Sequence, residues 1–174
     1  MQKREGAIKF KDKMLALIGP ELKAGDAAPE FTCATGPFDT VSLKDTPAKA
    51  RLFSVVPSLD TPVCEQQTKK FSDSVGAMGD VVATYTVSVD MPFAQKRFCA
   101  AHNIENIVNL ADIHDHSFGK NYGVLLEGLA FPLLTRAIFV VGKDNKIAYV
   151  EYVPEVGQHP NYDAALEALK AASA

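Results

Sequence analysis

The chain has 174 residues, of which 47% are hydrophobic and 22% are charged, with 11 Gly and 10 Pro. These are ordinary proportions for a globular protein, and they exclude a disordered or collagen-like chain. The 18 Lys and Arg residues are outnumbered by 21 Asp and Glu residues, which gives a formal net charge of -3. Because there is no basic excess to bind a phosphate backbone, the composition disfavours nucleic-acid binding. We expect one domain spanning residues 1–174.

The longest apolar stretch, residues 125–141, is interrupted by two charged residues and a proline, so we expect no membrane span. The basic segment 3–13 precedes only five apolar residues, too few for a secretory signal. Three cysteines without a CxxC pair argue against a disulfide framework and against a zinc site: Cys33, Cys64 and Cys99. We therefore expect a cytoplasmic protein with no metal and no cofactor, in which at least one thiol is structural or reactive.

In chain order, apolar and charged residues alternate over 8–13 and are followed by an apolar run at 14–18, a pattern that predicts a β-hairpin. Short strands are expected at 31–34 and around 41–43. The apolar run 52–56 predicts a central buried strand. A helix is expected over 62–78, with Thr61 as the N-cap and Pro62 at the first helical position.

The second half of the chain continues the alternation of strands and helices. We expect a strand at 81–88 and a helix at 92–102 whose inward face carries Ala94, Phe98 and Ala101. A strand at 107–110 and a short helix at 117–122 follow. Strands at 137–141 and 146–153 flank a turn, and an amphipathic helix is expected at 162–172.

This order of elements predicts an α/β protein of thioredoxin-like fold, in which helices flank a central mixed sheet. The N-terminal β-hairpin is an addition to that fold. Fold alone leaves the function open, so the function has to be argued from particular residues.

One turn-rich segment leads from the central strand into a helix: Pro57-Ser58-Leu59-Asp60-Thr61-Pro62-Val63-Cys64. In the first helical turn, the Cys64 thiol faces unpaired N–H groups and the positive end of the helix dipole. Lowering the pKa of a free thiol from about 8.5 to about 6 takes roughly 3.4 kcal/mol, whereas a helix terminus contributes ~0.3 to 1 kcal/mol. A reactive Cys64 therefore needs a neighbouring cation.

Arg136 is the best candidate for this cation because it begins an otherwise apolar strand. The alternative is an arginine at the strand edge that extends into solvent. Thr61 also has two roles open to it, which can coexist: its hydroxyl can accept a hydrogen bond from the Cys64 N–H as a helix cap, or it can bond to a substrate oxygen.

The segment from Pro57 to Cys64 resembles the peroxidatic loop of the thiol peroxidase subfamily of peroxiredoxins, whose pattern is Pro-Ser-x-Asp-Thr-x-x-Cys. Segments 25–31, 92–99, 135–137 and 162–166 are similar to the same subfamily, so the resemblance covers nearly the whole chain. It implies that Cys64 is the peroxidatic cysteine and Cys99 the resolving cysteine. It further implies that Thr61 and Arg136 bind the peroxide and that Pro57 shields the thiolate.

The resemblance implies a thiol-specific peroxidase that reduces hydrogen peroxide and organic hydroperoxides, with a leaning to alkyl hydroperoxides. The implied cycle passes through a Cys64 sulfenic acid and an intramolecular Cys64–Cys99 disulfide, which thioredoxin reduces, in a homodimer. The alternative is a peroxide sensor or redox relay that passes oxidation to a partner protein. A Cys-His hydrolase lacks a recognisable base, and a thioredoxin-type oxidoreductase would need a cysteine at the position of Thr61.

Cys99 lies 35 residues after Cys64 (99 minus 64) and on a different expected helix. We therefore expect the two Cα atoms to be further apart than the ~7 Å that a disulfide allows, so that both helices rearrange in each cycle. Cys99 shares a partly exposed stripe with Gln95 and His102. We expect His102 to be a surface residue, although activation of Cys99 by this imidazole is an alternative.

Three further features have structural explanations. Cys33 is expected to be an inert packed thiol, with an alternative role as a resolving cysteine. The segment His114-Asp115-His116 lacks further metal ligands nearby and is expected to cap a helix or to be solvated. The loop 130–134, which includes Phe131 and Pro132, departs from the subfamily pattern and leaves the peroxide preference open.

Overall fold

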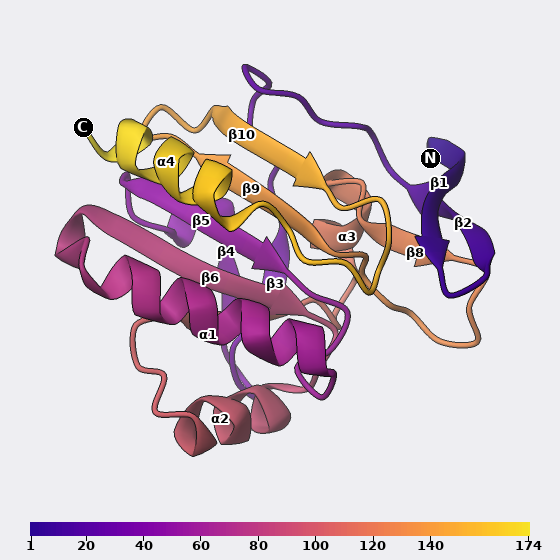
Figure 1. Cartoon of the computed structure of the whole chain (residues 1–174), viewed down its shortest axis with the longest axis horizontal. Coiled ribbons are helices and arrows are strands. Elements are labelled where there is room, and N and C mark those ends of the chain that lie inside the picture. The colour runs from indigo at the N-terminus through magenta and orange to yellow at the C-terminus, as the bar shows by residue number, and fades with distance from the viewer.

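A computed structural model describes all 174 residues. Its centre is a seven-stranded mixed sheet in the order β10-β9-β5-β6-β7-β3-β4 (Figure 1). In that order the strands are β10 (Ile147–Tyr152), β9 (Ala137–Val141), β5 (Ala50–Val55), β6 (Val82–Ser88), β7 (Val108–Ala111), β3 (Thr32–Ala34) and β4 (Thr40–Ser42). Strands β5, β6 and β7 are parallel to one another, and β9 runs antiparallel to β5. The predicted thioredoxin-like mixed sheet is confirmed.

Helices cover both faces of this sheet. They are α1 (Pro62–Gly76), α2 (Pro92–Ala101), α3 (Ser117–Asn121) and α4 (Tyr162–Ser173), with 3-10 turns η1 (Leu43–Asp45) and η2 (Gly79–Val81). Helices α1 and α4 lie side by side on one face, where Leu52, Phe71 and Leu169 are fully buried in one core (Figure 1). The opposite face holds an aromatic core with α3, which includes Phe53 and Phe118. No helix in the chain combines the length and the apolar character that crossing a bilayer requires.

The predicted N-terminal hairpin is present as β1 (Lys3–Phe10) and β2 (Lys13–Ile18). Its second strand pairs with a strand that the sequence pattern did not reveal, β8 (Leu125–Glu127), to form a separate three-stranded sheet. A three-residue strand is too short to show a period of two, so only the pairing with β2 makes it recognisable. This small sheet lies at one end of the molecule (Figure 1).

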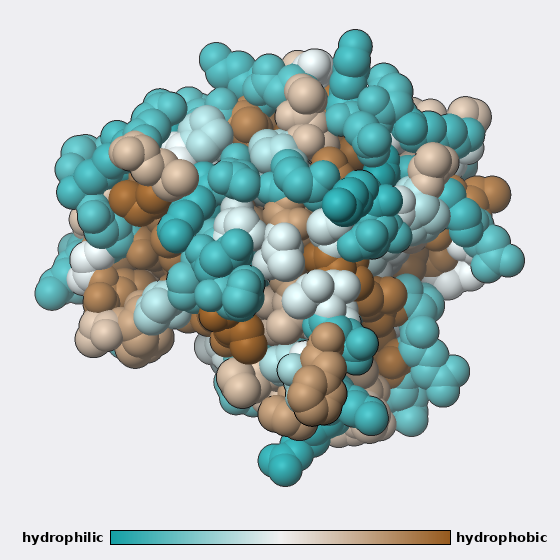
Figure 2. Space-filling view, turned by 180° about the vertical axis from the view of Figure 1, so that it is seen from behind, coloured by the Kyte–Doolittle hydropathy of each residue, from teal (hydrophilic) through white to brown (hydrophobic).

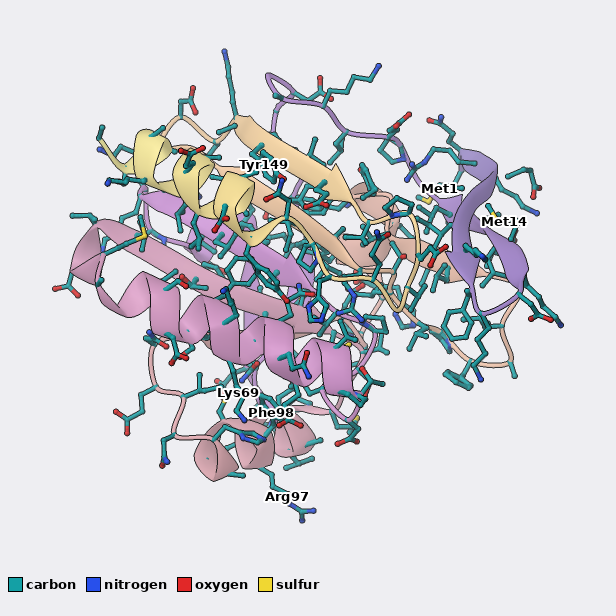
Figure 3. The ribbon with its side chains drawn as sticks, in the orientation of Figure 1. Met1, Met14, Lys69, Arg97, Phe98 and Tyr149 are labelled. Atoms are coloured by element: carbon teal, nitrogen blue, oxygen red, sulfur yellow. The ribbon has the colours of Figure 1, made fainter.

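The predicted inward face of α2 is wrong in part. Phe98 is buried, but Ala94 and Ala101 are exposed, and Gln95 is only 1% exposed. Gln95 is buried because its side-chain amide donates hydrogen bonds to Ser88 Oγ (3.1 Å) and to the Leu110 carbonyl (3.2 Å), which satisfy it inside the protein. Figure 3 shows Phe98 directed from α2 towards α1, whereas Arg97 extends away from both helices.

Seen from behind, the surface is largely hydrophilic, with hydrophobic residues in separate patches (Figure 2). The large apolar side chains that remain exposed are Met1, Met14, Phe38, Val81, Met91, Phe93, Val108 and Phe131. Scattered exposed apolar residues are normal on a globular protein. One of them, Phe131, belongs to the loop that departs from the subfamily pattern, and it is relevant to the site described next.

Candidate active site

Cys64 lies in the first turn of α1, as the sequence predicted, and its side chain is fully buried. The helix begins with Pro62, and its first backbone bond runs from the Glu65 N–H to the Thr61 carbonyl (3.0 Å). The N–H of Cys64 therefore precedes the first intrahelical bond and belongs to the unpaired donors of the helix N-terminus. The sulfur thus lies at the positive end of the α1 dipole.

Arg136 lies against this sulfur. Strand β9 pairs with β5 in a register that places Ala137 opposite Val55, so the preceding residue, Arg136, lies where β5 leads into the loop before α1. Its guanidinium Nη2 is 3.3 Å from Cys64 Sγ, and the residue is only 2% exposed. The structure therefore places Arg136 inside the protein and excludes the alternative of an edge arginine extending into solvent.

The other donors of Arg136 are held by neutral groups. Nε and Nη2 donate to the Val156 carbonyl (3.0 and 2.8 Å), and Nη1 donates to Gln67 Oε1 (2.9 Å). None of the ion pairs in the structure includes Arg136. A buried cation without a carboxylate is costly, and among its hydrogen-bond partners only the Cys64 sulfur can carry a negative charge. The Arg136 guanidinium therefore faces a single ionisable partner, the Cys64 sulfur.

Gln67 orients this arginine, a role not predicted from the sequence. It is fully buried on α1, one turn after Cys64, and its Nε2 donates to Ser54 Oγ of β5 (2.7 Å). Its Oε1 is thereby turned towards Arg136. The signal in the sequence was a glutamine at an apolar position of the helix stripe, because a buried amide requires polar partners inside the protein.

A cavity of about 660 Å³ opens beside Arg136, whereas the fully buried Cys64 is not among the residues that line it. Its walls come from the β1–β2 hairpin, the loop before α1, the loop after β8 and the segment after β10: Lys9, Phe10, Lys11, Pro57, Ser58, Thr61, Pro62, Val63, Phe131, Leu133, Arg136, Glu155, Val156 and Gly157. Three predicted site residues, Pro57, Thr61 and Arg136, therefore line one cavity. Phe131 of the atypical loop is 63% exposed and forms part of its wall.

The predicted helix cap by the Thr61 side chain is wrong. Thr61 occupies the N-cap position, but its side chain makes no capping bond to the helix. Its hydroxyl instead donates to the Ser58 carbonyl (3.0 Å), across the turn that precedes the helix. The oxygen of this hydroxyl keeps its acceptor capacity at the edge of the cavity.

Cys99 lies apart from this cavity, on α2. It is partly exposed, and Asn109 Nδ2 of β7 donates to its sulfur (3.0 Å). Cys64 and Cys99 are both free thiols, and Cys99 packs against the apolar cluster that contains Cys64 and Phe98. His102 is partly buried, packs against Phe98 with its ring tilted by 50° (4.5 Å between ring centroids), and places Nε2 3.7 Å from Glu65 Oε1.

The remaining candidates have structural partners. Cys33 is fully buried with its sulfur 3.8 Å from Asp112 Oδ1, and burial raises the pKa of the Cys33 thiol, an effect to which the Asp112 charge adds. It is a packed thiol, as predicted. Asp115 Oδ1 accepts a hydrogen bond from the Ser117 N–H (2.9 Å) at the start of α3, whereas the N-cap residue, His116, makes no side-chain capping bond. His116 Nδ1 lies 2.6 Å from the Asp112 carbonyl oxygen.

A buried thiol at a helix N-terminus, in contact with a buried arginine, thus lies beside the central mixed sheet of this α/β fold. The redoxin family model matches residues 23–166, and the chain belongs to the redoxin family. Among solved structures, it is similar to a peroxiredoxin-like protein from Aquifex aeolicus, with 39% identity and a TM-score of 0.87 over 97% of this chain and 98% of that chain. A thiol peroxidase from Chromobacterium violaceum, 21% identical with a TM-score of 0.84 over 94% of this chain and 95% of that one, shows the same fold.

Curated relatives define the subfamily. A thiol peroxidase of Halalkalibacterium halodurans is 49% identical over 95% of this chain and 98% of its own length. A thiol peroxidase of Bacillus subtilis is 44% identical over 94% of this chain and 96% of its own length. The resemblance of the 57–64 loop to the thiol peroxidase subfamily of peroxiredoxins is thereby confirmed, and the enzyme class is a peroxidase oxidoreductase.

Proposed function

We propose that the chain reduces hydrogen peroxide and organic hydroperoxides with Cys64 as the nucleophile. The contact that carries this proposal is the 3.3 Å approach of Arg136 Nη2 to Cys64 Sγ, in a site where the guanidinium has no carboxylate partner. The thiolate, and not the thiol, is the attacking species in such chemistry. A permanently charged arginine and a helix N-terminus both favour it.

In the first step the Cys64 thiolate attacks the terminal oxygen of the hydroperoxide. A sulfur–oxygen bond forms and the oxygen–oxygen bond breaks, so that Cys64 becomes a sulfenic acid and the leaving group departs as an alkoxide or hydroxide. Arg136 and the Cys64 N–H are the donors that stabilise the charge as it moves onto the leaving oxygen. The Thr61 hydroxyl accepts a hydrogen bond from the peroxide, and Pro57 shields the sulfur from water.

The cavity supports organic hydroperoxides among the substrates. Its volume of about 660 Å³ is much larger than the ~30 Å³ that a molecule of water's size occupies in a liquid. Apolar side chains on its walls, such as Val63, Phe131 and Leu133, suit an alkyl or aryl group attached to the peroxide. Hydrogen peroxide would use only the polar end of this cavity, where Thr61 and Arg136 lie.

In the second step the Cys99 thiol attacks the Cys64 sulfenic acid, forming a disulfide and releasing water. A dithiol reductant then opens that disulfide by thiol exchange, which restores both thiols. The resemblance to the subfamily supports thioredoxin as the reductant and a homodimer as the assembly. Forming the disulfide before further oxidation protects Cys64 from conversion to a sulfinic acid.

The test is mass analysis of peptides after one equivalent of hydrogen peroxide, combined with turnover in the presence of thioredoxin and its reductase. Wild type should show a Cys64–Cys99 link and sustained turnover. Cys64→Ser should lose peroxide reduction, and Cys99→Ser should keep the first oxidation but recycle poorly. Cys33→Ser is the matched control and should behave as wild type.

Two results would count against this proposal. Wild-type turnover in Cys99→Ser would show that another thiol resolves the sulfenic acid. Rapid oxidation of Cys64 with slow turnover would favour a peroxide sensor or relay that passes oxidation to a partner protein.

A further inference from the structure

Asp90 connects the loop before α1 to the strand that leads into α2. It follows the end of β6 and precedes α2, the helix that carries Cys99. Its Oδ1 accepts a hydrogen bond from Ser58 Oγ (2.8 Å), and its Oδ2 accepts one from the Leu59 N–H (2.8 Å). A single carboxylate therefore holds two residues of the loop that leads to Cys64.

The Asp90 carboxylate also accepts a hydrogen bond from the central sheet. Ser88 Oγ, at the end of β6, donates to Asp90 Oδ2 (2.8 Å). Gln95 of α2 donates to the same serine oxygen (3.1 Å) and to the Leu110 carbonyl of β7 (3.2 Å). Because Gln95 is only 1% exposed, this network forms a buried support beneath Asp90. It ties the start of α2 to the same carboxylate that holds the Cys64 loop.

These contacts are of the stronger kind. Hydrogen bonds to an ionised carboxylate are shorter and stronger than those between neutral groups. Asp90 takes part in none of the ion pairs in the structure, so its acceptor capacity is directed to Ser58, Leu59 and Ser88. The loop that includes Pro57 and Thr61 is thus held in the conformation that lines the cavity.

We propose that Asp90 is a positioning residue that sets the ratio of the two products formed from the Cys64 sulfenic acid, which are a sulfinic acid and a disulfide with Cys99. With the contacts of Asp90 intact, the loop stays in its peroxide-binding conformation, and a second hydroperoxide can oxidise the sulfenic acid to a sulfinic acid, itself being reduced to an alcohol. When the contacts break, the first turn of α1 unwinds, and the Cys99 thiol condenses with the sulfenic acid to form a disulfide and water. This inference rests on the proposed function.

The physical basis is the free energy of unwinding. If disulfide formation needs the loop and the first turn of α1 to move, as expected from the positions of the two cysteines on different helices, each hydrogen bond to Asp90 opposes that movement. Weakening these bonds should therefore accelerate disulfide formation while slowing the first attack on peroxide, because the loop is less well placed. A loss of stability away from the loop would leave both steps near their wild-type rates.

The test variant is Asp90→Ala, which removes all three contacts. We expect disulfide formation after oxidation to be about tenfold faster than in wild type, and the sulfinic acid fraction at high peroxide to fall correspondingly. The first oxidation of Cys64 should be several-fold slower. Stopped-flow measurement of the two steps and mass analysis of the Cys64 peptide provide both readouts.

Three further variants make the test specific. Ser58→Ala removes one of the hydrogen bonds between the loop and Asp90, so it should also raise the ratio of disulfide to sulfinic acid. This variant keeps the test valid if Asp90→Ala does not fold. Asp90→Asn can turn its amide oxygen to the Leu59 N–H and its nitrogen to Ser58 Oγ, so it should behave much more like wild type. Asp80→Ala, at an exposed acid in η2, is the matched control and should change neither step.

An unchanged ratio of disulfide to sulfinic acid in folded Asp90→Ala and Ser58→Ala would overturn the inference. Failure of the proposed function would be different, because peroxide would then leave Cys64 of the wild type unmodified. The two failures are therefore distinguishable in one set of experiments.

Discussion

At the scale of single residues, the chain contains two buried arginines with different surroundings. Arg51 is 1% exposed, and its Nη1 and Nη2 donate to Thr46 Oγ1, the Gly142 carbonyl and Asn145 Oδ1, while its Nε has no partner. Burial lowers the pKa of the Arg51 guanidinium. Arg136 is equally buried but touches a thiol. Burial of an arginine therefore does not by itself mark a reactive site, and the chemistry of its partner does.

Arg136→Met should leave the apolar surroundings intact while removing the charge beside Cys64. We expect the second-order rate of peroxide reduction to fall by roughly 10²- to 10³-fold, the usual effect of losing one group that stabilises transition-state charge. The ultraviolet absorbance of the thiolate at neutral pH should fall as well. Arg136→Lys keeps the positive charge but lacks the forked donors of a guanidinium, so its rate of peroxide reduction should lie between those of wild type and Arg136→Met. An unchanged rate and absorbance in Arg136→Met would remove Arg136 from the site.

Cys33 provides a prediction about pH. Burial, reinforced by the Asp112 charge, raises the pKa of the Cys33 thiol above its usual range. An acid whose pKa is raised keeps its proton, so Cys33 should stay a thiol from neutral to moderately alkaline pH and react slowly with iodoacetamide throughout. In a Cys64→Ser background, peptide mapping should show Cys99 labelled first. Equal labelling of Cys33 and Cys99 in the folded protein would contradict this prediction.

At the scale of elements, the cavity depends on an addition to the central fold. Strand β8 pairs with β2 of the N-terminal hairpin, and the chain after β8 returns over the cavity with Phe131 and Leu133. The hairpin contributes Phe10 to the same wall. The small sheet thus supplies an apolar side to the cavity beside Arg136, the residue before β9.

Phe131→Ala should therefore change which peroxides are preferred. We expect KM for a bulky aryl hydroperoxide to rise about tenfold, because an aromatic contact with the substrate is lost, while kcat/KM for hydrogen peroxide stays near the wild-type value. Steady-state kinetics with the two substrates provide the measurement. Phe93→Ala, at an exposed phenylalanine outside this cavity, is the matched control. Equal changes for both peroxides would show that Phe131 acts on the reactive groups instead.

At the scale of the whole molecule, the reduced chain is folded around both thiols. Helix α1 is formed from Pro62, so it includes Cys64, and α2 is formed through Ala101, so it includes Cys99. A disulfide allows a Cα spacing of only ~7 Å. We expect oxidation to lower hydrogen-exchange protection in the first turn of α1 and at the end of α2, while α4 stays protected. Identical protection of α1 and α2 in the reduced and oxidised protein would contradict the expected rearrangement.

Much of the fold could be predicted because the signals are local. Proline at the start of α1, the alternation in β1 and the turn between β9 and β10 each depend on a few neighbouring residues. The inward face of α2 was predicted wrongly because Gln95 finds buried partners on β6 and β7, and those strands are distant in sequence. Strand β8 was missed because it exists only by pairing with the hairpin.

The position of Cys64 at the start of a helix, after a turn-rich loop, follows from neighbouring residues alone, because backbone propensities and caps act over one or two turns. The contact between that sulfur and Arg136, 72 residues away, arises only in the folded chain, as do the contacts of Gln67 with the arginine and of Asp90 with the loop. The reason is the register of β5 with β9, which places Ala137 opposite Val55. A pairing between distant strands depends on how the whole sheet packs, and no window of neighbouring residues contains that information.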